Sequence, residues 1–287
     1  MNHEYAQVNG VRLHYVTAGS GPLMLFVHGY PEAWFAWEKQ LAEFARDHTV
    51  VAMDTRGINL SDKPVEVDAY SARHLVEDVR QLIPALGHQQ AIVVAHDWGG
   101  AAAWNLAAWH PEIVSKLVIL NSPHPVMFAR ELARNPEQQA ASKYMLLFRD
   151  PKAERVMSEN NYERMVRQLN GWIGGPNAPD EATIQRYRDA WAQPGAMTAG
   201  FNYYRASPLH PNPGVAVGQL SRERFTIKVP TLVIWGEKDP ALRPGLLDGL
   251  EEFVPDLRIE RIPEATHWVF HEFPERVNKH IRDFVAG

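Results

Sequence analysis

The sequence contains no cysteine, so neither disulfide bonds nor thiolate-bound metals are available to this chain. It also has no apolar run close to the ~20 residues that a membrane-spanning helix needs, and no charged and apolar leader resembling a signal peptide. Dense clusters of lysine and arginine are missing too, and the formal net charge is -5. We therefore expect a cytoplasmic protein that binds neither nucleic acid nor a membrane.

What is present suits a large α/β protein. The 287 residues are 45% hydrophobic and 22% charged, which is ordinary for globular proteins. Asn9-Gly10 separates two short segments and is a strong hairpin signal. Continuous apolar runs of strand length follow at residues 22–29, 49–54, 91–97, 116–120 and 231–236. Runs that are apolar on both faces favour parallel strands covered by helices.

Helical periodicity at residues 72–86 and 100–109 alternates with these runs. The alternation predicts a mostly parallel α/β sheet with an antiparallel hairpin at one edge. It stops between Asn121 and Lys228, where helix-like windows occur at residues 131–148, 154–169 and 180–191. We therefore predict a core domain of residues 1–123 and 229–287, with a helical cap of residues 124–228 inserted into it.

Polar residues follow directly after several predicted strands, at the edge where open parallel sheets bind their ligands. They are His28, Asp54, Asp97, Asn121 and Asp239. Asp97 is the most informative, because its strand runs straight into two glycines and an alanine-rich helical pattern.

Residues 95–99, Ala-His-Asp-Trp-Gly, have the form of a nucleophile elbow, G-x-S-x-G, with aspartate in place of serine and alanine in place of the first glycine. An aspartate here could also be a simple helix N-cap. The local sequence alone leaves both roles open.

Five segments in order resemble the epoxide hydrolase branch of the α/β-hydrolase family, and together they span nearly the whole chain. They are HGYPEAWFAW (28–37), DTRGINLSDKP (54–64), AHDWGG (95–100), WGEKDP (235–240) and ATHWVFHEFPERVN (265–278). The resemblance implies the α/β-hydrolase fold, with a mostly parallel eight-stranded sheet, flanking helices and an inserted cap.

The resemblance also implies a triad of Asp97, Asp239 and His267; Glu237 is a neighbouring candidate for the acid that the GEKD pattern disfavours. An aspartate side chain is ordinarily a carboxylate at neutral pH and needs no base before it attacks carbon. His267, oriented by Asp239, would then activate the water that hydrolyses the resulting ester. The backbone N–H groups of Tyr30 and Trp98 are expected to hold the oxyanion.

An epoxide oxygen leaves as an alkoxide and needs a proton. The resemblance supplies two donors from the cap, Tyr144 in ASKYMLLFRDP and Tyr204 in FNYYRA. Ordinary packing is the alternative for a lone tyrosine. For the substrate pocket we predict Trp34, Trp98 and Phe148, each of which could equally be a core residue.

No cofactor is expected. His271 lies four residues after His267, a spacing that on a helix could suit a metal pair. No further ligand cluster accompanies it, so we predict no metal site and place His271 behind the catalytic centre.

The predicted reaction is the hydrolysis of a small apolar epoxide by water to a vicinal diol, by a monomer or homodimer. A haloalkane or haloacetate dehalogenase using the same Asp97 is one alternative. Haloacetate dehalogenases carry arginine at the position of Trp98 and their acid at the position of Asn121, and haloalkane dehalogenases often have asparagine at that of Tyr30. A hydrolase-fold binding protein without turnover is the other alternative.

Overall fold

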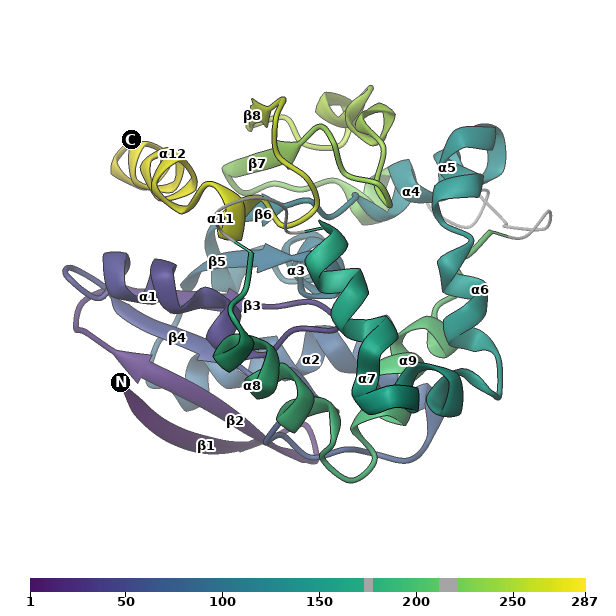
Figure 1. The fold of residues 1–287 in the computed structure, drawn as a ribbon. Helices are drawn as coiled ribbons and strands as arrows, with labels where there is room; N and C mark the ends of the chain where they lie inside the picture. Colours follow the sequence, from purple (N-terminus) through teal and green to yellow (C-terminus); the bar gives the residue numbers. More distant parts are fainter. Residues whose placement is uncertain (173–177, 212–220) are drawn as a thin grey trace.

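The computed structural model describes residues 1–172, 178–211 and 221–287. Eight strands form a sheet in the order β1-β2-β4-β3-β5-β6-β7-β8 (Figure 1). The strands are β1 Asn2–Val8, β2 Val11–Ala18, β3 Leu23–Val27, β4 Thr49–Met53, β5 Ala91–His96, β6 Val114–Leu120, β7 Thr231–Gly236 and β8 Leu257–Ile262. β2 pairs antiparallel with both β1 and β4, and the pairs from β4 to β8 are parallel. The predicted mostly parallel sheet with its antiparallel edge hairpin is confirmed.

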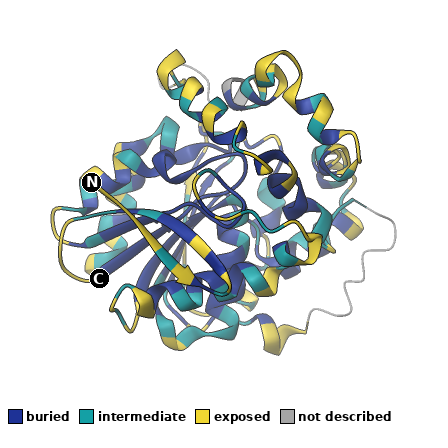
Figure 2. Ribbon diagram, turned by 90° about the horizontal axis from the view of Figure 1, so that it is seen from below, coloured by how far each residue is buried: buried dark blue, intermediate teal, exposed yellow. Residues whose placement is uncertain are grey.

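Helices cover both faces of this sheet. Successive residues of each central strand face opposite sides of the sheet and belong to two separate apolar clusters. On one side, Met24 and Phe26 of β3 pack toward α1 (Glu38–Phe44) and α12 (Pro274–Ala286). Leu25 and Val27 pack toward α2 (Ala72–Ala85) and α3 (Asp97–Trp109). Figure 2 shows the central strands buried between helices, with the N-terminal strand largely exposed. Being apolar on both faces is what made these strands recognisable in the sequence.

A series of helices separates β6 from β7: α4 (Pro125–Arg134), α5 (Pro136–Ala141), α6 (Tyr144–Arg149), α7 (Ala153–Trp172), α8 (Glu181–Trp191), α9 (Ala196–Ala206) and α10 (Arg222–Phe225). The short helix α11 (Val269–Glu272) precedes α12. These helices occupy the stretch predicted as a cap, and the division into core and cap at the stated boundaries stays a proposal. No helix in the described ranges is long and apolar enough to cross a membrane.

The helices of this region agree only in part with the three predicted windows. The window at 131–148 is not one helix, because α4 ends and a new helix starts at Pro136 with Asn135 as its N-cap. Asn135 accepts a hydrogen bond from the N–H of Glu137 at 2.9 Å, which replaces the interrupted helical bonding. α7 contains non-helical backbone at residues 159–162. α8 lies where the third window predicted a helix, and α9 was not predicted.

α9 packs closely against the core. A Cβ atom added to Gly200 would lie 2.0 Å from Cε2 of Tyr30, so only glycine allows this approach. The hydroxyl of Tyr203 donates to the carbonyl of Arg56 at 2.7 Å. These contacts hold α9 over the loops that follow β3 and β4.

Candidate active site

The turn between β5 and α3 places Asp97 in strained backbone geometry. Its φ angle is 49°, in the left-handed region that non-glycine residues rarely adopt. A Cβ on Gly99 would lie 2.2 Å from the Val27 carbonyl oxygen, and one on Gly100 would lie 2.3 Å from Cβ of Ser122. The two glycines therefore let α3 start in direct contact with its neighbours, which fixes the turn and directs Asp97 outward.

The Asp97 carboxylate faces two partners from other parts of the chain. Its Oδ1 accepts a hydrogen bond from the backbone N–H of Tyr30 at 3.0 Å. Its Oδ2 lies 3.7 Å from Nε2 of His267. The N-cap of α3 is His96, and Asp97 does not cap the helix. The capping alternative is therefore wrong, and the carboxylate is free to act on a ligand.

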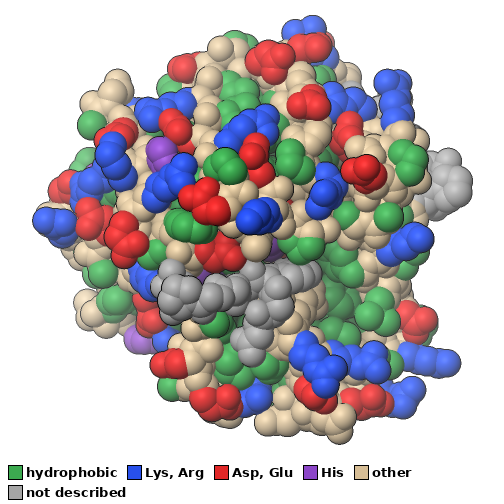
Figure 3. All heavy atoms as spheres, turned by 45° about the horizontal axis from the view of Figure 1, so that its top comes forward, with side chains coloured by type: hydrophobic (Ala, Val, Ile, Leu, Met, Phe, Trp, Pro, Cys, Tyr) green, Lys and Arg blue, Asp and Glu red, His purple; other side chains and the backbone are tan. Residues whose placement is uncertain are grey.

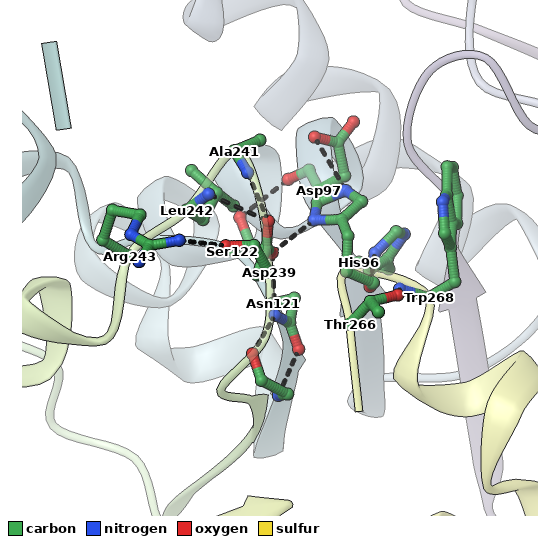
Figure 4. Close-up of polar contacts among 12 residues, drawn as sticks. His96, Asp97, Asn121, Ser122, Asp239, Ala241, Leu242, Arg243, Thr266 and Trp268 are labelled. Atoms are coloured by element: carbon green, nitrogen blue, oxygen red, sulfur yellow. Dashed lines mark hydrogen bonds and ion pairs between the residues drawn. The ribbon is translucent and has the colours of Figure 1, made fainter. Parts of the chain in front are cut away.

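Asp239 is fully buried and held by four hydrogen bonds. Its Oδ2 contacts Nδ1 of His267 at 2.6 Å and accepts from the side-chain amide of Asn121 at 2.8 Å. Its Oδ1 accepts from the N–H groups of Ala241 and Leu242 at 2.8 and 2.9 Å (Figure 4). Burial pushes the pKa of Asp239 up, but the charge and hydrogen bond of His267 and the other donors hold that pKa below its usual value. Asp239 is thus kept as a carboxylate beside the imidazole.

Glu237, the neighbouring candidate for the acid, pairs instead with Arg261 at 3.0 Å, and its side chain is 30% exposed. Asn121 is a positioning residue that the sequence did not assign. Besides holding Asp239, its Oδ1 accepts from the N–H of Gly236 at 2.8 Å. The one signal in the sequence was its place among the polar residues at the strand ends.

The charged neighbours of His267 outweigh its burial. Burial alone would lower the pKa of this imidazole, but Asp239, and further away Asp97 and Glu32, raise the pKa to about 9. The resting side chain is therefore protonated at neutral pH and balances part of the negative charge. Any step that removes the charge of Asp97 makes His267 easier to deprotonate, so that more of it is the neutral imidazole that can accept a proton.

A buried polar network supports the loop of His267. The carboxylate of Glu32 lies 2.6 Å from Nε2 of His271 and 3.2 Å from Nδ1 of His96. Nε2 of His96 lies 3.0 Å from the His267 carbonyl oxygen. His271 is therefore behind the catalytic centre, as predicted. Within the described parts of the chain, no group of three or more histidine, aspartate or glutamate side chains is arranged to hold a metal ion.

Two phenols from the inserted helices lie near the carboxylate. Tyr144 begins α6 and Tyr204 lies on α9, with their ring centroids 6.0 Å apart. Tyr204 packs edge-on against Trp98 at 5.1 Å. Burial raises the pKa of both hydroxyls well above the usual value, and the negative charge of Asp97 raises both further. Both phenols therefore stay protonated over the whole neutral range and can donate a proton or hydrogen bond.

A cavity of about 230 Å³ opens beside these groups. Its lining residues include Tyr70, Ala72, Leu75, Asp97, Trp98, Ala101, Ala102, Asn105, Trp109, Ser122, Pro123, Pro125, Phe128, Tyr144, Met145, Tyr203, Tyr204, Ser207, Pro208, Leu209, Phe225 and Leu242. None of these is lysine, arginine or histidine, so the cavity suits a largely apolar ligand. Outside it, Figure 3 shows charged side chains of both signs interspersed over one face of the molecule.

The three predicted pocket residues lie in different places. Trp98 lines the cavity. Trp34 is not among the lining residues; its backbone N–H donates to Oδ1 of Asp54 at 2.9 Å, and its ring packs on Phe35. Phe148 also lies outside the lining, 1% exposed, and packs behind Tyr204 with ring centroids 4.9 Å apart. Phe148 thus supports Tyr204 from the core, whereas Trp34 packs against the rings of His3 and Phe35 outside the cavity lining.

The sequence is similar to known proteins over nearly its whole length. Residues 22–274 match the family model described as the alpha/beta hydrolase fold. The chain is 34% identical to epoxide hydrolase 3 of Xenopus tropicalis, over 99% of this chain and 77% of the relative. It is 36% identical to the AB hydrolase superfamily protein YfhM of Bacillus subtilis, over 99% and 98% of the two chains. The chain belongs to the epoxide hydrolase branch of the α/β-hydrolase family.

A crystal structure of an epoxide hydrolase from Bacillus megaterium in complex with an inhibitor is similar over 99% of this chain and 100% of that one, with a TM-score of 0.91 and 37% identity. The family and fold expected from the five sequence segments are thus confirmed. For this epoxide hydrolase family member, the roles of the individual residues follow from the contacts above and are proposed below.

Proposed function

We propose that the protein hydrolyses epoxides to vicinal diols through a covalent ester on Asp97. The observation that supports this proposal most is the position of the two oxygens of the Asp97 carboxylate. One oxygen is fixed by the N–H of Tyr30 at 3.0 Å, and the other faces His267 at 3.7 Å. The relatives named as epoxide hydrolases, and the apolar lining of the cavity, agree with an epoxide as the ligand.

In the first step, Oδ2 of Asp97 attacks a carbon of the three-membered ring. The bond between that carbon and the ring oxygen breaks, and an ester forms. The ring oxygen takes a proton from Tyr144 or Tyr204. Donation by a positioned acid contributes typically ~10²–10⁴-fold to such a step. The chain places both phenols in the same cavity as Asp97, which supports their role as donors.

The resting proton of His267 then restores the phenol that gave its proton in the first step. In the second step, the neutral imidazole of His267 takes a proton from a water molecule, and the resulting hydroxide attacks Cγ of Asp97. The oxyanion forms at Oδ1, where the N–H of Tyr30 already donates, and the N–H of Trp98 is proposed as the second donor. The bond between Cγ and Oδ2 then breaks, the remaining proton of the attacking water passes to Oδ2, and the diol leaves with this oxygen while Asp97 is again a carboxylate. Since the ester has neutralised Asp97, the pKa of His267 is lower at this stage than in the free enzyme.

Dehalogenation by the same nucleophile is the second candidate, and three observations count against it. Two buried phenols are available to an alkoxide, whereas a departing halide needs no proton. Trp98 stands where haloacetate dehalogenases carry arginine, and no cation lines the described part of the cavity. Haloacetate dehalogenases carry their catalytic acid at the position of Asn121, which in this chain is an amide that donates a hydrogen bond to Asp239.

The test has two parts. Incubation with styrene oxide should yield the diol, and incubation with chloroacetate should yield no chloride; Asp97→Ala should give neither product. A single turnover in ¹⁸O-labelled water with excess enzyme should give a first diol without label, because its new oxygen comes from Asp97. Chloride release without diol would make the protein a dehalogenase, and label in the first diol would contradict the ester.

A further inference from the structure

The cavity continues past the catalytic groups along one side of α3. Ala101, Asn105 and Trp109 line it at successive intervals of four residues, which places them on one face of this helix. With a rise of about 1.5 Å per residue, Asn105 lies roughly 12 Å along the axis from Asp97. A substrate bound at Asp97 therefore has room for an extended substituent that reaches Asn105.

Asn105 is the unusual member of this wall. The residue is only 6% exposed, and its side-chain Nδ2 donates to the Ala101 carbonyl at 2.7 Å. That contact with an acceptor fixes which end of the amide carries the nitrogen. Oδ1 has no hydrogen-bond partner among the described residues, and it is not enclosed by protein atoms. Its carbonyl oxygen is thus left for whatever occupies the cavity.

The other hydroxyl groups in the wall, outside the two proposed proton donors, already have partners, and the unpartnered Nε1 of Trp109 is enclosed by protein atoms. The hydroxyls of Tyr70 and Tyr203 donate to the carbonyls of Pro64 and Arg56 at 2.8 and 2.7 Å. Ser122 donates to the carbonyl of Asp97 at 2.7 Å. Ser207 exchanges hydrogen bonds with the backbone of Leu209.

We propose that Asn105 is a specificity-determining residue, whose free carbonyl oxygen binds a neutral hydrogen-bond donor, a hydroxyl or an N–H group, at the far end of an elongated epoxide. This rests on the proposed hydrolysis at Asp97. A purely apolar substituent would bury the carbonyl oxygen without a partner, which is unfavourable. A carboxylate would meet an acceptor rather than a donor, and none of the described lining residues is cationic.

The experiment compares matched substrates. Terminal epoxyalkanes of increasing length are paired with epoxyalkanols that carry a hydroxyl on the last carbon. At roughly 1.2 Å per bond of extended chain, the hydroxyl should begin to matter at about six to ten bonds from the ring. At that length kcat/KM should favour the alcohol about three- to tenfold, mainly through KM, because the contact is made equally in the ground and transition states. Shorter pairs should show no such preference.

Asn105→Leu should reverse the preference for the alcohol, because the leucine side chain has no acceptor and makes favourable apolar contact with the alkyl chain. Asn105→Asp, which keeps an acceptor oxygen, should retain it. Ser207→Ala is the matched control: it removes a lining hydroxyl that is already bonded within the chain, so the preference should persist.

Equal kcat/KM for alcohol and alkane at every length in the wild-type protein would overturn the role of Asn105 while leaving epoxide hydrolysis intact. A preference that survives in Asn105→Leu would also overturn it. Failure to hydrolyse any member of either series would overturn the proposed function and, with it, this inference.

Discussion

Asn121 and His267 bind the same oxygen of one carboxylate: the amide of Asn121 donates to Oδ2 of Asp239 at 2.8 Å, and Nδ1 of His267 contacts it at 2.6 Å. Asn121 reaches Asp239 from the end of β6, while its own Oδ1 accepts the N–H of Gly236 at the end of β7. It therefore fixes the acid loop to the neighbouring strand. The imidazole is oriented through this chain of contacts.

Asn121→Ala should lower the rate of ester hydrolysis about tenfold. The substitution removes a hydrogen bond to a charged group, worth about 1.5–3 kcal/mol, and leaves Asp239 less firmly placed. Rapid-quench measurement of both steps checks this, and ring opening should change less. Asn278→Ala is a suitable control, because its side-chain oxygen contacts Gln40 at 3.2 Å away from the triad. Equal slowing of both steps would point to a general loss of structure instead.

His267→Gln should allow the ester to form and then trap it. Ring opening needs the carboxylate of Asp97, whereas the water attack needs the imidazole as base. Intact-protein mass spectrometry after incubation with an epoxide should therefore show one added substrate mass, located on a peptide containing Asp97. Normal multiple turnover by this variant would show that another group is the base.

Tyr144→Phe and Tyr204→Phe should each slow ring opening by up to ~10²-fold, the lower range for one acid donor, and leave ester hydrolysis nearly unchanged. The double variant should lose more than either single one. Tyr203→Phe provides the comparison, since that hydroxyl donates to the carbonyl of Arg56 at 2.7 Å. A double variant with full ring-opening rate would remove both phenols from the mechanism.

The pKa of His267 predicts two pH effects. In the free protein it is raised to about 9, whereas in the ester form Asp97 no longer contributes its charge. The rate of ester hydrolysis should therefore rise with pH through a pKa below 9, while NMR titration of the resting imidazole should report about 9. A hydrolysis step with the same pKa as the free protein would mean that the charge of Asp97 does not act on the imidazole.

The free energy of unfolding should also depend on pH through the titration of His267. A pKa raised from 6.5 to about 9 stabilises the fold fully below pH 6.5, and this contribution is lost as pH rises through about 9. Urea unfolding across this window should show a fall in the free energy of unfolding. The fall should be smaller in His267→Gln; an unchanged slope in that variant would assign the effect to other groups.

The sequence predicted those parts of the molecule whose signal is local. Strands apolar on both faces, the turn at Asp97 and its two glycines could be recognised because each needs a particular run of residues. The role of Asn121 could not, since it depends on a contact between β6 and the loop after β7. Trp34 and Phe148 could not be placed either, because an aromatic side chain in an apolar segment can face the cavity or the core equally well.

The helix α9 was missed for a similar reason. Its segment contains glycine, threonine and two adjacent tyrosines, which have weak helix propensity in isolation. Packing over the core, with Gly200 against Tyr30, compensates for this. The propensity of the segment is overridden by contacts that only the folded chain provides.

The approach of Gly200 to the Tyr30 ring has a consequence for engineering. Tyr30 donates its N–H to Asp97 and packs its ring against the helix that bears Tyr204, so one residue contacts both the proposed nucleophile and the helix of a proposed proton donor. If the inserted helices of another family member were grafted onto this scaffold, we expect the position of Tyr204 and that of the Tyr30 N–H to change together. A chimaera would need a matching partner pair at both positions to keep its catalytic alignment.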